Sequence, residues 1–175
     1  MRELCVRKPG RKRKDPTTIQ VVGKLFSLMT SRVLLDKYVD FGVPIVTILL
    51  KMFSIPNTLV EPGANINVMT MEAMQILNID IIIPSPIVFE LGNKSKVKPK
   101  GAIEDNNVFL DSWAYRVDFT ILKPKYNLGG HPLILGRPSL STTDAFISCR
   151  SGNMTITNVV EMKHITLYPP KKICK

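Results

Sequence analysis

One short segment of this 175-residue sequence holds residues that could do acid–base chemistry. Two apolar residues lead directly into an acid and a glycine turn, in the order Leu59-Val60-Glu61-Pro62-Gly63-Ala64-Asn65. A carboxylate at the end of a buried strand is costly unless it is paired or used. The sequence therefore makes Glu61 the candidate catalytic residue, and Pro62, Gly63, Ala64 and Asn65 the candidate active-site loop.

A second segment, later in the chain, has a related pattern. Here an apolar strand ends abruptly at a glycine and an arginine and turns into a short helix, in the order Ile134-Leu135-Gly136-Arg137-Pro138. Proline favours the first turn of a helix, because its missing N–H has no partner there in any case. We expect the two segments to belong together, with residues 134–137 as a structural motif beside Glu61.

Other chemistry finds little support in the sequence. The two histidines, His131 and His164, have no acid or cysteine pattern around them that would complete a metal site. The cysteines Cys5, Cys149 and Cys174 are odd in number and contain no CxxC pair, which argues against a disulfide framework and a structural zinc site. We therefore expect no metal, no cofactor and a reducing compartment, with Cys149 as a small buried filler.

The elements that must position the acid are mostly short strands. From Val43 onward, β-branched runs broken by Pro, Gly and Asn are typical of an all-β barrel or sandwich. The predicted strands are Ile45–Met52, Asn57–Glu61, Ile87–Leu91, Ala102–Leu110, Trp113–Leu122, Pro132–Leu135, Ala145–Cys149, Met154–Thr157 and Ile165–Tyr168. Two helical turns are predicted at Thr70–Leu77 and Pro138–Thr143. Apolar residues spaced by three and four between Ile19 and Val33 predict one amphipathic helix before them.

Composition indicates a globular chain with a basic start. Hydrophobic residues make up 45% and charged residues 22%, so the chain can build a core. The net charge of +10 is uneven, because residues 1–14 hold seven of the 24 Lys and Arg but one of the 14 Asp and Glu. This tail is either a solvated linker or a weak nucleic-acid contact. With no membrane-length apolar run and no signal peptide, we expect an intracellular, cytoplasmic protein, with the nucleus as an alternative.

The two segments together resemble the retropepsin family of aspartic proteases. In that family a hydrophobic pair precedes Asp-Thr/Ser-Gly-Ala, and a later hydrophobic pair precedes Gly-Arg. The proteases of plant gypsy-type LTR retrotransposons are the nearest in pattern. Their blocks have counterparts here from about residue 37 to residue 167, namely Glu61 to Asn65, Lys98 to Asp105, Val117-Asp118-Phe119, Leu135 to Leu140 and Cys149-Arg150-Ser151-Gly152.

The resemblance implies a closed, retropepsin-like β-barrel with one or two short helices and a flap hairpin. It also implies a homodimer in which each subunit gives one catalytic acid, a peptide or polyprotein substrate, and a structural role for Arg137. The flap would lie within residues 93–101 and include Ser95, Lys96, Val97 and Lys98. We expect a basic lead-in over residues 1–36, the protease-like domain over 37–168 and a C-terminal tail over 169–175.

Two departures from the family pattern bear on activity. The family places two carboxylates about 3 Å apart to share one proton, one acting as base toward water. Glu61 has one methylene more than the aspartate of the family, and Pro62 has neither the hydroxyl nor the N–H of Thr or Ser. We therefore expect an impaired aspartic endopeptidase module of a retrotransposon polyprotein. The alternatives are a non-catalytic dimerisation or peptide-binding pseudoprotease, and a nucleic-acid-binding protein that uses the basic tail.

Overall fold

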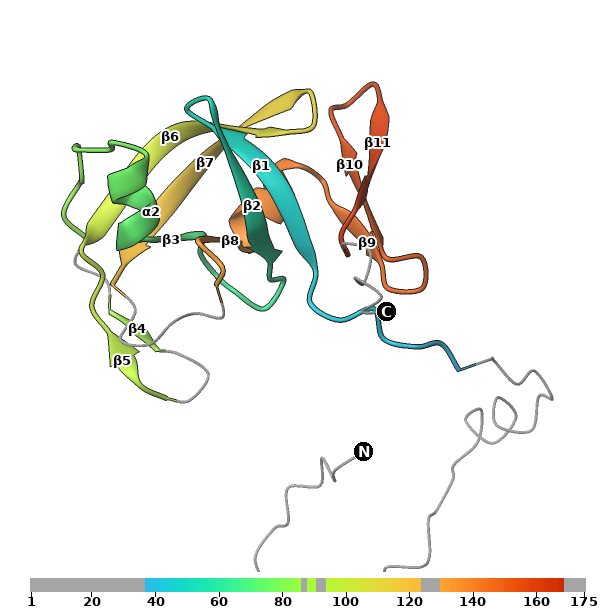
Figure 1. The fold of residues 1–175 in the computed structure, drawn as a ribbon, viewed down its shortest axis with the longest axis horizontal. Helices are drawn as coiled ribbons and strands as arrows, with labels where there is room; N and C mark the ends of the chain where they lie inside the picture. Colours follow the sequence, from blue (N-terminus) through green and yellow to red (C-terminus); the bar gives the residue numbers. More distant parts are fainter. Residues whose placement is uncertain (1–36, 86–87, 91–93, 124–129, 169–175) are drawn as a thin grey trace, which may run out of the picture. The chain divides into compact units, whose positions relative to one another are not determined.

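The structure is a computed structural model that describes residues 37–85, 88–90, 94–123 and 130–168. Contacts within the chain divide it into Met1–Lys37 and Tyr38–Lys175, and the account below concerns the second unit. Its centre is a closed barrel with the strand order β1-β2-β8-β3-β7-β6 (Figure 1). The six strands are β1 (Ile45–Leu50), β2 (Phe53–Val60), β3 (Val68–Thr70), β6 (Gly101–Leu110), β7 (Trp113–Leu122) and β8 (Leu133–Leu135).

Two long hairpins build most of the barrel wall. In β1 alternate residues face inward, and Ile48 stands opposite Ile55 of β2, with both buried. In β2 the alternation is broken by a register shift between Ile55 and Thr58. The turn between them places Lys51 and Met52 at positive φ, the backbone geometry that lets a tight hairpin follow the strand twist. The second hairpin joins β6 to β7 through Asp111, also at positive φ. Each hairpin joins strands that are neighbours in sequence, and each contains one register shift where the period of two is interrupted.

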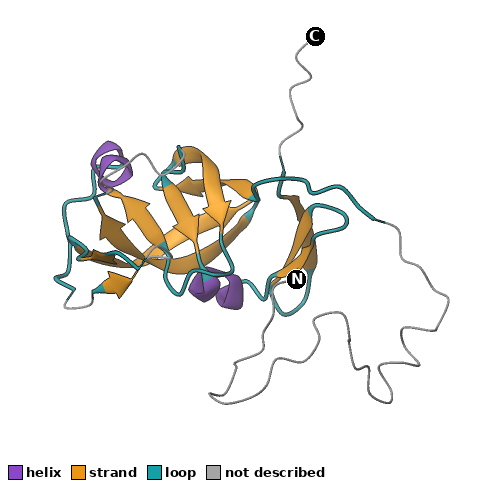
Figure 2. Ribbon diagram, turned by 90° about the horizontal axis from the view of Figure 1, so that it is seen from below, coloured by secondary structure: helices purple, strands orange, loops and turns teal. Residues whose placement is uncertain are grey.

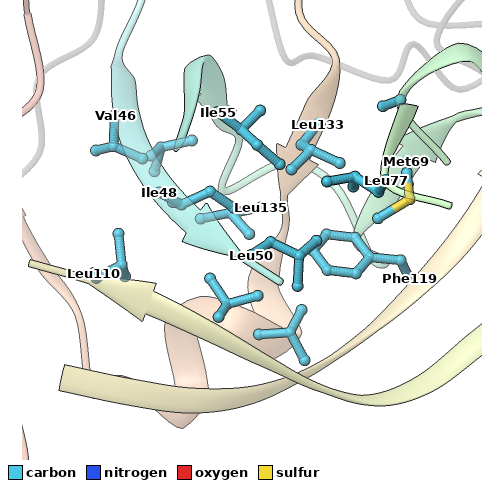
Figure 3. Packing of buried hydrophobic residues seen from close by; sticks show 14 of the residues in the cluster. Val46, Ile48, Leu50, Ile55, Met69, Leu77, Leu110, Phe119, Leu133 and Leu135 are labelled. Carbon is cyan, nitrogen blue, oxygen red and sulfur yellow. The ribbon is translucent and has the colours of Figure 1, made fainter. Parts of the chain in front are cut away.

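The core lies inside this barrel (Figure 3). Among its most deeply buried side chains are six from four different strands, each at most 2% exposed: Ile48, Leu50, Met69, Phe119, Leu133 and Leu135. Burying one such side chain fully contributes about 1.5–3 kcal/mol. The short strands β3 and β8 therefore hold their places through core contacts, since few main-chain hydrogen bonds are available to three residues.

Two short helices cover the barrel. Helix α2 (Met71–Ile76) begins at Thr70, whose Oγ accepts a hydrogen bond from the Ala73 N–H at 3.1 Å. Helix α3 (Arg137–Thr142) begins at Gly136, with Pro138 in its first turn. Both helices were predicted. Each begins directly after a strand, α2 at a capping threonine and α3 at a glycine followed by a first-turn proline. No helix in the described ranges is long and apolar enough to cross a membrane.

A separate antiparallel sheet follows α3 (Figure 2). It contains β9 (Phe146–Ser148), β10 (Asn153–Thr157) and β11 (Met162–Thr166). Lys163 of β11 reaches the β6–β7 turn, where its Nζ lies 2.6 Å from a carboxylate oxygen of Asp111 and 4.8 Å from the ring centre of Trp113. The Lys163 ammonium holds the pKa of the Asp111 carboxyl below its usual range. This ion pair joins the small sheet to the barrel.

The all-β barrel with short helices agrees with the predicted fold class, and the differences concern single elements. Strand β3 was not predicted, and β2 begins at Phe53 rather than at Asn57. Strand β11 ends at Thr166, earlier than the predicted Tyr168. Cys149 is exposed rather than buried, because it lies in the turn between β9 and β10. The predicted helix between residues 19 and 33 lies outside the described residues.

Candidate active site

The structure brings Glu61 to the end of the Leu135 strand. Strands β2 and β8 run parallel, with Leu59 beside Ile134 and Val60 beside Leu135. The Glu61 N–H then donates to the Leu135 carbonyl oxygen at 2.9 Å. The acid thus leaves the barrel at the point where β8 also ends. The two segments that the sequence analysis grouped together therefore share one edge of the barrel.

The Glu61 carboxylate folds back onto its own loop. The residue is exposed, and its Oε1 accepts a hydrogen bond from the Gly63 N–H at 3.0 Å. A Cβ on Gly63 would lie 2.8 Å from that same oxygen, closer than a Cβ contact allows. The obstructing oxygen is the free end of an exposed, flexible side chain, so a Cβ at position 63 would make the Glu61 carboxylate turn aside and break its hydrogen bond to the Gly63 N–H.

The loop after Glu61 is fixed to the start of α3. The Ala64 N–H donates to the Glu61 carbonyl at 3.0 Å, and the Ala64 carbonyl accepts from the Arg137 N–H at 2.9 Å. The guanidinium of Arg137 also donates to the Asn65 side-chain oxygen. Arg137 thus contacts the active-site loop twice, while Pro62 is exposed at its tip. This arrangement agrees with the structural role expected for Arg137.

Asn67 connects the loop to both neighbouring strands, and the sequence analysis assigned it no role. Its side-chain oxygen accepts from the Gly136 N–H and from the Ser139 hydroxyl, each at 2.9 Å. Its side-chain amide donates to the Asp118 carbonyl at 3.0 Å. The residue is 3% exposed, so these bonds are made away from water. The signal for this role in the sequence is an amide between the apolar Ile66 and Val68.

At Gly136 the backbone passes very close to the backbone of the loop that follows Glu61. A Cβ at this position would lie 2.2 Å from the Ile66 carbonyl oxygen and 2.9 Å from the Ala64 carbonyl oxygen. Its φ of −90° is open to any residue, so the requirement for glycine is steric. Any side chain would push the acid loop away from the end of β8. The glycine therefore sets the distance between the two halves of the site.

Comparison with solved structures identifies the architecture. The chain is similar to the retroviral protease-like domain of Ddi1 from Leishmania major, with a TM-score of 0.56, 14% identity, and coverage of 75% of this chain and 98% of that one. It is also similar to EIAV protease complexed with the inhibitor HBY-793, with a TM-score of 0.50, 15% identity, and coverage of 61% and 93%. The fold is retropepsin-like. Neither a scan against protein-family models nor a search of curated protein sequences found a match.

Two short strands, β4 and β5, pair beside and within the range 93–101 in which the flap is predicted. Strand β4 (Phe89–Glu90) pairs with β5 (Lys96–Val97), with Phe89 opposite Val97 and Glu90 opposite Lys96. In Figure 1 the two strands are at the lower left, below α2 and β3. Lys96 is exposed while Val97 is half-buried, so the two faces of the hairpin differ in polarity. Ser95 and Lys98, the remaining predicted flap residues, are both exposed.

The two histidines have neighbours that explain them without a metal. His131 Nδ1 lies 2.9 Å from the Asn57 carbonyl oxygen, and His164 Nδ1 lies 2.8 Å from the Thr155 hydroxyl. Over the described ranges, no three His, Cys, Asp or Glu side chains gather in a way that could hold a metal ion.

Proposed function

We propose that this chain is an aspartic endopeptidase-type module of a retrotransposon polyprotein, active as an intracellular homodimer and impaired by glutamate at its catalytic position. The observation that carries the proposal is the place of Glu61, an exposed acid directly after a buried strand and hydrogen-bonded to the end of β8. The retropepsin-like fold supports the protease class. The ordered sequence blocks between residues 37 and 167 support the retrotransposon origin.

The chemistry requires a second subunit. One chain presents a single acid at this edge, whereas peptide hydrolysis by carboxylates uses a pair that shares one proton. The ionised member takes a proton from water as the water attacks the peptide carbonyl carbon. The protonated member donates a hydrogen bond to the carbonyl oxygen, and a proton then passes to the leaving amine. Two copies of Glu61 facing each other would supply this pair.

The extra methylene of Glu61 is the reason for expecting impairment. The Gly63 N–H holds Oε1 at 3.0 Å, so the longer side chain is bent back rather than extended from the loop. The bond fixes one oxygen, yet the carbon chain between it and the backbone is one atom longer than in aspartate. Misplacement on the order of 1 Å costs about 100-fold in rate. We therefore expect slow turnover by the wild-type chain.

A peptide-digestion assay tests this proposal. A peptide library is incubated with the full chain and with the variants Glu61→Asp, Glu61→Gln and Glu161→Gln. We expect slow cleavage by the wild type and by Glu161→Gln, an exposed control carboxylate in the β10–β11 turn. Cleavage should be at least about tenfold faster in Glu61→Asp and absent in Glu61→Gln. A pepstatin-like transition-state mimic should inhibit every active form.

A second candidate function is a peptide-binding or dimerisation pseudoprotease. Pro62 favours it, because this exposed residue offers no hydroxyl or N–H to tie two acid loops together across a dimer. This alternative predicts dimers in sedimentation and peptide binding without any cleavage, in Glu61→Asp as well as in the wild type. Cleavage that survives in Glu61→Gln would contradict both functions, since the carboxylate would then be dispensable.

A further inference from the structure

The arm that leads from the flap into the barrel has one basic face. Along residues 96–100 the exposed lysines Lys96, Lys98 and Lys100 alternate with half-buried Val97 and buried Pro99. In an extended chain, residues two apart lie on the same face with a separation of about 6.6–6.8 Å. We call these three lysines the flap lysine face. It is a single row of positive charges at an even interval.

No lysine of the row belongs to an ion pair in the part of the chain that the structure describes. The ion pairs found there are Arg116 with Asp105 and Lys163 with Asp111, and neither includes a lysine of the row. One exposed acid, Glu90, stands opposite Lys96 in the β4–β5 pairing. Like charges in a row repel one another unless an anion lies between or beside them. The row is therefore suited to an anionic partner supplied from outside the chain.

We propose that the flap lysine face binds an extended acidic segment of a polypeptide, with Asp or Glu at alternate positions. Such a segment repeats its charges at the same interval as the lysines, so that Lys96, Lys98 and Lys100 each meet one carboxylate. Among the described residues, strand β5 pairs with β4 alone, which leaves its other edge for an added chain. The last step rests on the proposed function. Under that function, the acidic segment is the part of the substrate that lies beside the cleaved bond.

A nucleic acid fits this face less well. Proteins that bind nucleic acid through phosphates typically contact about 6–10 of them, whereas this row offers three lysines. Glu90 is the cross-strand partner of Lys96 and offsets part of its charge, so the net positive charge of the row is smaller still. The number and arrangement of charges thus favour a polypeptide.

Binding can be measured without any need for cleavage. In the full chain carrying Glu61→Gln, the affinity is followed by fluorescence anisotropy of a labelled ten-residue peptide in which Glu alternates with Val. The variant Lys96→Gln/Lys98→Gln removes two charges from the row. Lys37→Gln/Lys51→Gln removes two exposed lysines elsewhere and is the matched control. The Gln-for-Glu version of the peptide is the uncharged ligand, and a ten-nucleotide single-stranded RNA is the competing anion.

We expect the acidic peptide to bind about 3- to 20-fold more weakly to the row variant than to the control, as for two exposed charge pairs. Raising the salt from 0.05 M to 0.5 M should remove this difference, because the Debye length shortens. Equal affinity in the two variants, equal binding of the Gln peptide, or absence of peptide binding would overturn the inference. So would RNA binding that depends on the row and exceeds that of the peptide.

The outcome is independent of the outcome of the digestion assay. If the acidic peptide binds in a row-dependent way to a chain that never cleaves, the proposed binding face stands and the proposed catalysis is rejected. The opposite result is cleavage of library peptides with no preference for acidic residues near the bond, together with unchanged binding in the row variant. In that case the proposed catalysis stands and the proposed binding face is rejected.

Discussion

Replacing Gly136 with alanine tests whether steric contact sets the geometry of the acid loop. The added Cβ would lie 2.2 Å from the Ile66 carbonyl oxygen and 2.9 Å from that of Ala64. Ordinary van der Waals contact begins at about 3.4 Å, so the Ile66 backbone would have to move by roughly 1 Å. Because both obstructing atoms belong to the backbone, no side-chain rotation can relieve the contact.

The expected loss of stability follows from two effects. Overpacking a dense interior costs about 1–3 kcal/mol. Moving the loop also breaks the hydrogen bonds from the Gly136 N–H to Asn67 and from the Arg137 N–H to Ala64. A buried polar group without a partner costs about 1–3 kcal/mol. We therefore expect Gly136→Ala to lower the free energy of unfolding by about 3–5 kcal/mol, a large part of the stability of a typical domain.

Urea unfolding followed by the fluorescence of Trp113, the single tryptophan, measures this loss. The control is Gly42→Ala, where the φ of 101° strains any side chain but nothing lies within 4 Å of the added Cβ. Strain of this kind costs about 1–2 kcal/mol. If Gly136→Ala lowers the free energy of unfolding no more than Gly42→Ala does, the steric account of the site is refuted.

Two further predictions concern the polar contacts. Asn67→Ala should lower the free energy of unfolding by about 3–5 kcal/mol in thermal denaturation, because two buried partners, Gly136 and Ser139, and the Asp118 carbonyl lose their bonds. Asn106→Ala, which removes one exposed bond, should change it by less than about 1 kcal/mol. The lowered pKa of Asp111 predicts that its pairing with Lys163 stabilises the fold above pH 3.8 and is lost as the pH falls further through the pKa in the folded chain. Asp111→Asn should therefore destabilise the chain at neutral pH. We also expect an acid transition in the Trp113 fluorescence of the wild type below pH 3.8, and its loss in Asp111→Asn.

Much of the architecture was predictable because it depends on local patterns. The β6–β7 hairpin has long alternating strands, and α2 begins at a threonine that caps it. Strand β3 was missed because its three residues, Val68–Thr70, are all buried and carry no alternation. A run of this length becomes a strand through its neighbours, since β7 and β8 lie on either side of it. Such a strand forms because of its tertiary contacts, which the periodicity of the sequence does not reveal.

The candidate site divides in the same way. The order of Glu61, Gly63 and Gly136 along the chain was enough to group the two segments. The bend of the Glu61 side chain onto the Gly63 N–H was not predictable, because it depends on a loop geometry that several strands define. The role of Asn67 was also hidden, since its three partners come from elsewhere in the chain. Partners of this kind are known only when the fold is known.

The long sequence separation inside the site has a consequence for synthesis on the ribosome. Asn67 and Ser139, which bond each other, are 72 positions apart. At about 5–20 residues per second, a ribosome needs roughly 4–14 s to make the second residue after the first. A nascent chain therefore contains the whole β1–β2 hairpin several seconds before the residues that surround Glu61 have been synthesised. Any self-processing of the proposed polyprotein must wait until translation has passed this domain.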